Sequence, residues 1–138
     1  MANEHVLMTQ KTYPISMTCA NGTGIEKGAL LSLADLDTAA TSTTTAEALA
    51  GVAYTEKVAS DGNTSIAVLS GPGDELKAYA SGSIAVGDPL MAANTTSFPN
   101  YLMAATPGLS GSHTIGIAKE TAADGETFKY VLQMGVAA

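Results

Sequence analysis

The sequence predicts an all-β fold made of short antiparallel strands, and three observations lead to this class. Short runs in which apolar and polar residues alternate occur along most of the chain, as expected for half-buried strands. Fourteen glycines and five prolines separate these runs and act as breakers between elements. Asp-Gly pairs at 61–62 and 124–125 stand between such runs, and this dipeptide is typical of tight hairpin turns.

The strands can be placed in order from these runs. We expect them over residues 13–19, 28–33, 51–58, 64–70, 75–80, 84–86, 90–92, 113–119 and 127–134. In the first of them, Tyr13, Ile15, Met17 and Cys19 share one face. The last is the clearest, because apolar Phe128, Tyr130, Leu132 and Met134 share a face, as the period of two requires.

The remaining segments are expected to be an arm and loops. Residues 1–12 show no clear period and are assigned to an N-terminal arm, which leaves residues 13–138 as a single β domain. Residues 34–48 are rich in Ala and Thr and are predicted to be a surface loop, with one helical turn near 46–49. Further polar loops are expected over 93–100 and 106–112.

The two halves of the chain resemble each other. A unit that reads Gly, short apolar strand, loop, Gly-Val-Ala, Asp-Gly turn and alternating strand occurs at about 25–71. A similar order, with Gly-Ile-Ala in place of Gly-Val-Ala, occurs at about 84–136. We interpret the pair as a possible degenerate duplication of one β unit. The alternative is that any hairpin protein rich in Asp-Gly turns repeats in this way.

The composition argues against nucleic acid and membranes as partners. All six basic residues are Lys, and thirteen carboxylates give a net charge of −7 and a pI of about 4.5. Phosphate recognition depends on Arg and on basic patches, which this chain lacks. No signal peptide or membrane-spanning stretch is expected. With two Phe, five Tyr and no Trp, the core should be weak enough that oligomerisation contributes to stability.

No catalytic, cofactor or metal site is expected. The single cysteine, Cys19, lies within an alternating apolar run, where a small buried thiol is the usual explanation, so a Cys19–His113 dyad is disfavoured. Four aspartates beside Gly or Pro are predicted to bond their own turns rather than a metal, namely Asp61, Asp74, Asp88 and Asp124. The glycine-rich stretches lack the Lys-Ser/Thr of a phosphate-binding loop.

Three segments carry a resemblance to a known family. Residues 50–70, 71–78 and 80–90 read, in order, Gly-Val-Ala, strand, Asp-Gly turn, strand, Gly, strand and Gly-Asp-x-Leu. Over about residues 13–136 the chain is similar to the capsid decoration (cement) proteins of tailed phages, including the lambda-type head decoration proteins and related phage head families. The Gly-Ile-Ala, Asp-Gly-Glu and Gly-Val pattern of 116–136 resembles the closing unit of that family.

The resemblance implies a small β-tulip or barrel-like domain with an N-terminal arm and long polar loops. It implies a homotrimer that is made in the host cytoplasm and binds the outer surface of the phage head. There it would contact the major capsid protein and stabilise the head against internal DNA pressure. The contact is expected at Val6, Leu7, Met8 and Thr9, because related arms add a strand to the capsid protein through main-chain pairing.

Three other functions stay open at this stage. A head-fibre or receptor-binding module would contact host glycans through its loops, where Phe98 and Tyr101 are the candidate aromatic platforms. A small enzyme would have to use Cys19. An acidic adaptor would bind a protein partner outside any virion.

Overall fold

The structure is a computed structural model that describes residues 3–93 and 99–136, and it confirms the all-β class. Within these residues it contains eleven strands and one short 3-10 turn, η1 (Gly111–His113). The strands are β1 (Val6–Thr9), β2 (Ile15–Thr18), β3 (Leu30–Asp35), β4 (Thr38–Thr41), β5 (Leu49–Ala53), β6 (Ser65–Leu69), β7 (Glu75–Tyr79), β8 (Pro89–Ala92), β9 (Leu102–Ala104), β10 (Thr114–Ala118) and β11 (Thr127–Leu132).

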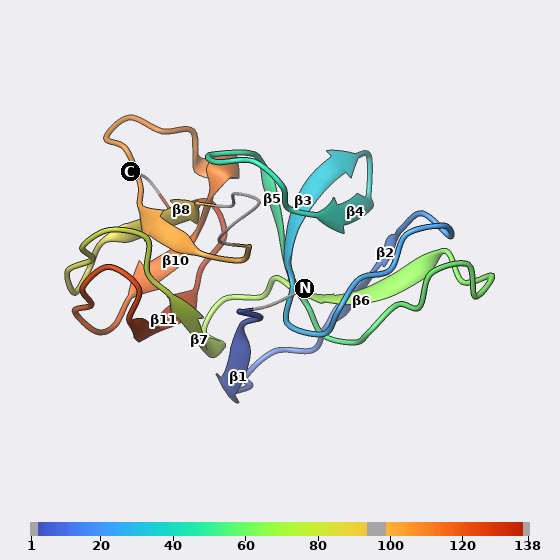
Figure 1. The fold of residues 1–138 in the computed structure, drawn as a ribbon, viewed down its shortest axis with the longest axis horizontal. Coiled ribbons are helices and arrows are strands. Elements are labelled where there is room, and N and C mark those ends of the chain that lie inside the picture. Colours follow the sequence, from blue (N-terminus) through green and yellow to red (C-terminus); the bar gives the residue numbers. More distant parts are fainter. Residues whose placement is uncertain (1–2, 94–98, 137–138) are drawn as a thin grey trace.

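The strands form two units that lie side by side (Figure 1). The first unit is a closed barrel with the order β2-β4-β3-β5-β6. It closes because β2 pairs antiparallel with β6 and also meets β4 in parallel, at Thr18 and Thr38. The second unit is a six-stranded sheet with the order β1-β7-β11-β10-β8-β9. The N-terminal strand β1 therefore belongs to the second unit, although it precedes the first in the chain.

The two units use the same pattern of main-chain contacts. An isolated bridge joins Ile25 to Lys57 in the first unit, and another joins Ile84 to Ala122 in the second. After each isoleucine a glycine N–H donates at 2.8 Å, from Gly28 to the carbonyl of Ala53 and from Gly87 to that of Ala118. The parallel contact of β2 with β4 also has a counterpart, a parallel bridge between Ala80 and Leu102. A duplication would produce such a pattern, and the common origin of the halves stays a prediction.

A glycine stands at the same place in both units. A Cβ added at Gly51 of β5 would lie 2.2 Å from the carbonyl oxygen of Leu69, and one added at Gly116 of β10 would lie 2.1 Å from that of Val131. Only glycine lets the paired strands come this close. The Gly-Val-Ala and Gly-Ile-Ala motifs therefore begin with the residue that each strand pairing requires.

The apolar core has two clusters, one of which joins the units. The smaller lies inside the barrel and consists of Met17, Cys19, Ile25, Ala29, Leu31, Ala39, Ala50, Ala53, Ile66 and Val68. The larger is centred on the sheet and includes Phe128, Tyr130 and Leu132, so the predicted inner face of the last strand is confirmed. Four barrel side chains, Leu30, Leu49, Val52 and Leu69, pack in this larger cluster. The two units thus share apolar contacts where they meet.

Several sequence-based boundaries were wrong. Residues 34–48 contain strand β4 and the end of β3, and the turn expected near 46–49 is absent because β5 begins at Leu49. Strand β9 was not predicted, and of the strand expected over 84–86 only the bridge at Ile84 forms. The missed strand β4 reads Thr-Ala-Ala-Thr. Its Ala39 is buried but is too small to show as a period-two pattern.

The first predicted strand is buried at only one end. Met17 and Cys19 point into the barrel, whereas Ile15 is 49% exposed and Tyr13 is 92% exposed. The barrel closes over the C-terminal part of this run, where β2 contacts both β4 and β6. The remainder of the alternating face is thus left outside.

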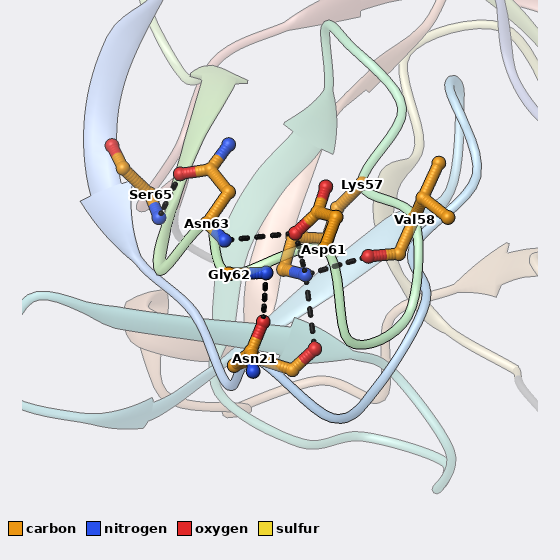
Figure 2. Close-up of polar contacts among 7 residues, drawn as sticks. All are labelled: Asn21, Lys57, Val58, Asp61, Gly62, Asn63 and Ser65. Carbon is orange, nitrogen blue, oxygen red and sulfur yellow. Dashed lines mark hydrogen bonds and ion pairs between the residues drawn. The ribbon is translucent and has the colours of Figure 1, made fainter.

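The Asp61-Gly62 segment is not the two-residue hairpin turn that the sequence predicted. Positive φ angles occur at Ser60 (59°) and Gly62 (84°), but not at Asp61. Instead the loop wraps around the buried ammonium of Lys57 (Figure 2), whose Nζ donates to the carbonyls of Asn21 (3.0 Å) and Val58 (2.7 Å) and to Oδ1 of Asp61 (2.7 Å). This lysine lowers the pKa of Asp61. A buried charge that is fully hydrogen-bonded can fix the course of an irregular loop.

Candidate interaction strand at the N-terminus

The segment predicted to be an N-terminal arm contains an ordered edge strand. Strand β1 pairs antiparallel with β7, with Val6 opposite Lys77, Leu7 opposite Leu76 and a bulge before Thr9. It is the terminal strand of the sheet order, so its second edge pairs with no strand among the described residues. Figure 1 shows β1 near the junction between the two units. Within the predicted N-terminal arm of residues 1–12, Val6–Thr9 is thus a strand of the sheet unit.

The four residues predicted to contact a capsid differ in exposure. Leu7 is partly buried and packs against the larger core cluster. Val6 is 56% exposed and Met8 49% exposed, and Thr9 is also exposed. Alternate side chains of a strand point to opposite faces, so Leu7 attaches the strand to the body while Val6 and Met8 are presented to solvent. Their contact with a capsid stays a prediction.

His5 anchors the start of β1 and is buried, with 4% of its surface exposed. Its Nε2 lies 2.8 Å from the carbonyl oxygen of Asn100, and its Nδ1 lies 2.6 Å from the hydroxyl of Tyr130. Because a carbonyl only accepts, Nε2 carries the proton, and Nδ1 accepts from the tyrosine hydroxyl. The main-chain N–H of His5 also donates to the carbonyl of Gly28 at 2.7 Å. One residue thus joins β1 to three remote segments.

Burial has a direct effect on the two titratable groups of this anchor. It lowers the pKa of His5 from 6.5 to about 4 and raises that of Tyr130 well above 10.0. In both cases removal from water disfavours the charged form. The imidazole is therefore neutral at pH 7, in agreement with the acceptor role of Nδ1. Asn100 extends the network, because its Oδ1 accepts from the N–H of Leu30 at 3.0 Å.

A second anchor follows β1 at residues 11 and 12. The fully buried carboxylate of Asp74 accepts from the main-chain N–H groups of Lys11 (2.5 Å) and Thr12 (2.9 Å) and from the Thr12 hydroxyl (2.6 Å). Thr12 packs tightly on Gly71: a Cβ added at Gly71 would lie 2.5 Å from Oγ1 of Thr12. These charge-assisted bonds hold the end of the N-terminal segment on the sheet unit.

The predicted role of the four turn aspartates was correct for only two. Asp61 accepts from the N–H of Asn63, and Asp88 accepts from that of Ala85, so both bond their own turns. Asp74 instead accepts from the N–H groups of Lys11 and Thr12, which lie 63 and 62 positions away in the sequence. Asp124 accepts from the N–H of Gly82, which lies 42 positions away. The sequence next to an aspartate therefore does not predict which distant main-chain group its carboxylate will bind.

An open groove runs beside β1. It has a volume of about 790 Å³ and is lined by Glu4, His5, Val6, Leu7, Lys27, Tyr54, Thr55 and Glu56. Its walls therefore come from β1, from the segment before β3 and from the segment after β5. Both acidic and basic side chains line it, so its charge does not select an anionic or a cationic ligand.

The residues considered for catalysis lie apart. Cys19 is buried in the barrel cluster, and Nδ1 of His113 lies 2.9 Å from the hydroxyl of Ser112 at η1. Within the described part of the chain no hydrogen bond joins the two. Over residues 3–93 and 99–136, no group of three His, Cys, Asp or Glu is arranged to hold a metal ion. Among those residues, no helix has the length and apolar character needed to cross a bilayer.

The chain matches solved structures, but no family model and no curated protein matches it. One of the matching structures is the N base of head fiber gp8.5 of bacteriophage phi29, with 17% identity and a TM-score of 0.49. The match covers 91% of this chain and 98% of that one.

Proposed function

We propose that this chain is a decoration (cement) protein of a tailed phage, which binds the outer surface of the head as a homotrimer and stabilises it. The sequence resemblance over residues 13–136 supports the proposal. The observation that carries it is the N-terminal strand β1, which combines the exposed apolar side chains of Val6 and Met8 with an edge that no strand of the described residues pairs with. Such edges can recruit a strand of another protein.

In this proposal β1 lies against the major capsid protein, and the rest of the body forms the outer layer. Main-chain pairing along the open edge would give affinity, while Val6 and Met8 would fill apolar pockets of the capsid surface. The acidic composition, with a net charge of −7 and no Arg, suits a position outside the head, away from the packaged genome. Clamping of neighbouring capsomers would then counter the pressure of that genome.

Two measurements on the wild-type protein test the proposal. Light scattering should give a mass of about 42 kDa, three times the chain mass of 13.9 kDa. Mixing with expanded, undecorated heads and sedimentation should give saturable binding with a fixed number of copies per head. A monomer that stays in the supernatant at every concentration would contradict the proposal.

Substitution on β1 tests the contact surface more sharply than deletion. Removal of residues 1–12 would also remove the His5 and Asp74 anchors, so it would confound binding with folding. We propose Val6→Lys and Met8→Lys, with Val58→Lys as the matched control, because Val58 is 57% exposed and Val6 is 56% exposed. The β1 variants should bind heads at least tenfold more weakly, and the control should bind like the wild type. Equal binding by all three would place the contact elsewhere.

The alternative function is a head-fibre or receptor-binding module that contacts host glycans. Of its two aromatic candidates, Phe98 lies outside the described residues, and Tyr101 stacks on Tyr79 with ring centroids 5.5 Å apart and planes at 16°. This packing covers one face of each ring, which leaves less surface for a sugar. Binding to host cells without binding to heads would favour this alternative over the decoration protein.

A further inference from the structure

We propose that His5 is an acid-operated latch for the N-terminal strand: protonation of its imidazole frees residues 3–9 from the body, while the other strands of both β units stay folded. The latch concerns the free protein and does not depend on the proposed function. In this proposal His5 does more than anchor β1: its protonation state determines whether β1 is docked with its edge available for pairing.

The hydrogen bonds of His5 favour the neutral imidazole and are disrupted when the ring gains a second proton. In the docked state Nε2–H donates to the carbonyl of Asn100, and Nδ1 accepts from the hydroxyl of Tyr130. Protonation of Nδ1 would place two donors face to face, because an imidazolium has no acceptor. The hydroxyl would have to turn and accept, and its own proton would lose the one hydrogen bond that it makes among the described residues. An unpaired buried donor is costly.

Among the described residues, the ring nitrogens of His5 contact a hydroxyl and a carbonyl, and neither is an anionic partner for a positive charge. Charged and titratable groups near it are Glu4 on its own segment, Lys27 before β3, Tyr54 and Glu56 after β5, and Tyr130 on β11. Neither ring nitrogen hydrogen-bonds a carboxylate. Burial is the main cause that lowers the pKa of His5 to about 4. Once the segment leaves the body and enters water, the imidazole regains an ordinary pKa near 6.5, so acid favours the released state.

The contacts of β1 explain why release is local. Among the described strands, β7 is the one that β1 pairs with. Of the residues of β1, Leu7 packs against the larger cluster, and its side chain is only partly buried. Behind it, Asp74 holds Lys11 and Thr12, so residues 3–9 can detach without unfolding the chain that follows. Segments with few buried contacts open at the lowest free energy.

The test is a pH titration of the full chain from 7.5 to 3.5, followed by the amide signals in ¹⁵N NMR spectra. Signals of residues 4–9 should move to unstructured positions with a midpoint between pH 4 and 6.5. Signals of β5 and β10 should keep their folded positions through this step. Loss of all signals in one transition, or β1 signals that stay folded to pH 3.5, would overturn the latch.

Three variants assign the step to His5. His113→Gln, which changes the half-buried histidine at η1, should leave the midpoint unchanged. His5→Gln should remove the pH-dependent step, with residues 4–9 in one state throughout. Tyr130→Phe removes the donor to Nδ1 and should raise the midpoint. A step that persists unchanged in His5→Gln would show that another group operates it.

Discussion

Gly116→Ala should destabilise the protein by about 3 kcal/mol, because the strand pairing leaves no room for a methyl group. The new Cβ would lie 2.1 Å from the carbonyl oxygen of Val131, whereas real contacts of this kind stay above 3.0 Å. The strands β10 and β11 would have to separate by about 1 Å at a point where Gly116 pairs with Leu132. Overpacking costs about 1–3 kcal/mol, and the upper end applies because the obstacle is main chain rather than a flexible side chain.

The assay is differential scanning calorimetry of the purified variant. For a domain of this size, a loss of 3 kcal/mol lowers Tm by about 10 °C. Gly51→Ala should cost at least as much, since its Cβ would meet the oxygen of Leu69 at 2.2 Å and its φ is +139°. The control is Gly22→Ala, where nothing lies within 4 Å of the added Cβ, and it should change stability by less than about 0.5 kcal/mol. If Gly116→Ala lost no more stability than this control, the claim that the pairing of β10 with β11 leaves no room for a Cβ would be refuted.

Three further predictions concern buried polar groups. Lys57→Met removes the three hydrogen bonds that the buried ammonium donates to the carbonyls of Asn21 and Val58 and to Oδ1 of Asp61. This should cost about 3 kcal/mol in guanidinium unfolding; a loss below about 1 kcal/mol would contradict this account of the loop. Asp74→Ala removes three hydrogen bonds to the N-terminal segment and should speed its proteolysis at least tenfold, whereas Asp88→Ala, which affects a local turn, should not. The pKa of His5 is about 4 when folded and about 6.5 when unfolded, so the unfolded state binds more protons between these values. The contribution of neutral His5 to the free energy of unfolding is therefore complete above pH 6.5 and falls by up to about 3 kcal/mol as the pH approaches 4. If the free energies of unfolding of the wild type and of His5→Gln differed by the same amount at every pH, this linkage would be excluded.

The N-terminal segment shows most clearly what local sequence patterns can and cannot predict. Residues 1–12 have no strong period, so they were interpreted as an arm, and yet Val6–Thr9 is a strand of the second unit. The signal for its position lies elsewhere in the chain. His5 bonds Tyr130, which is 125 residues away, and Asp74 bonds Thr12, which is 62 residues away. No local pattern contains either pair.

Features decided within a few residues could be derived from the sequence alone. The all-β class and the inner face formed by Phe128, Tyr130 and Leu132 follow from the period of the sequence. The tertiary structure decided the closure of the barrel, the strands β4 and β9, and the attachment of β1 to β7. These depend on which distant segments become neighbours, and an Ala-rich strand or a lone histidine gains its role only from the groups that surround it after folding.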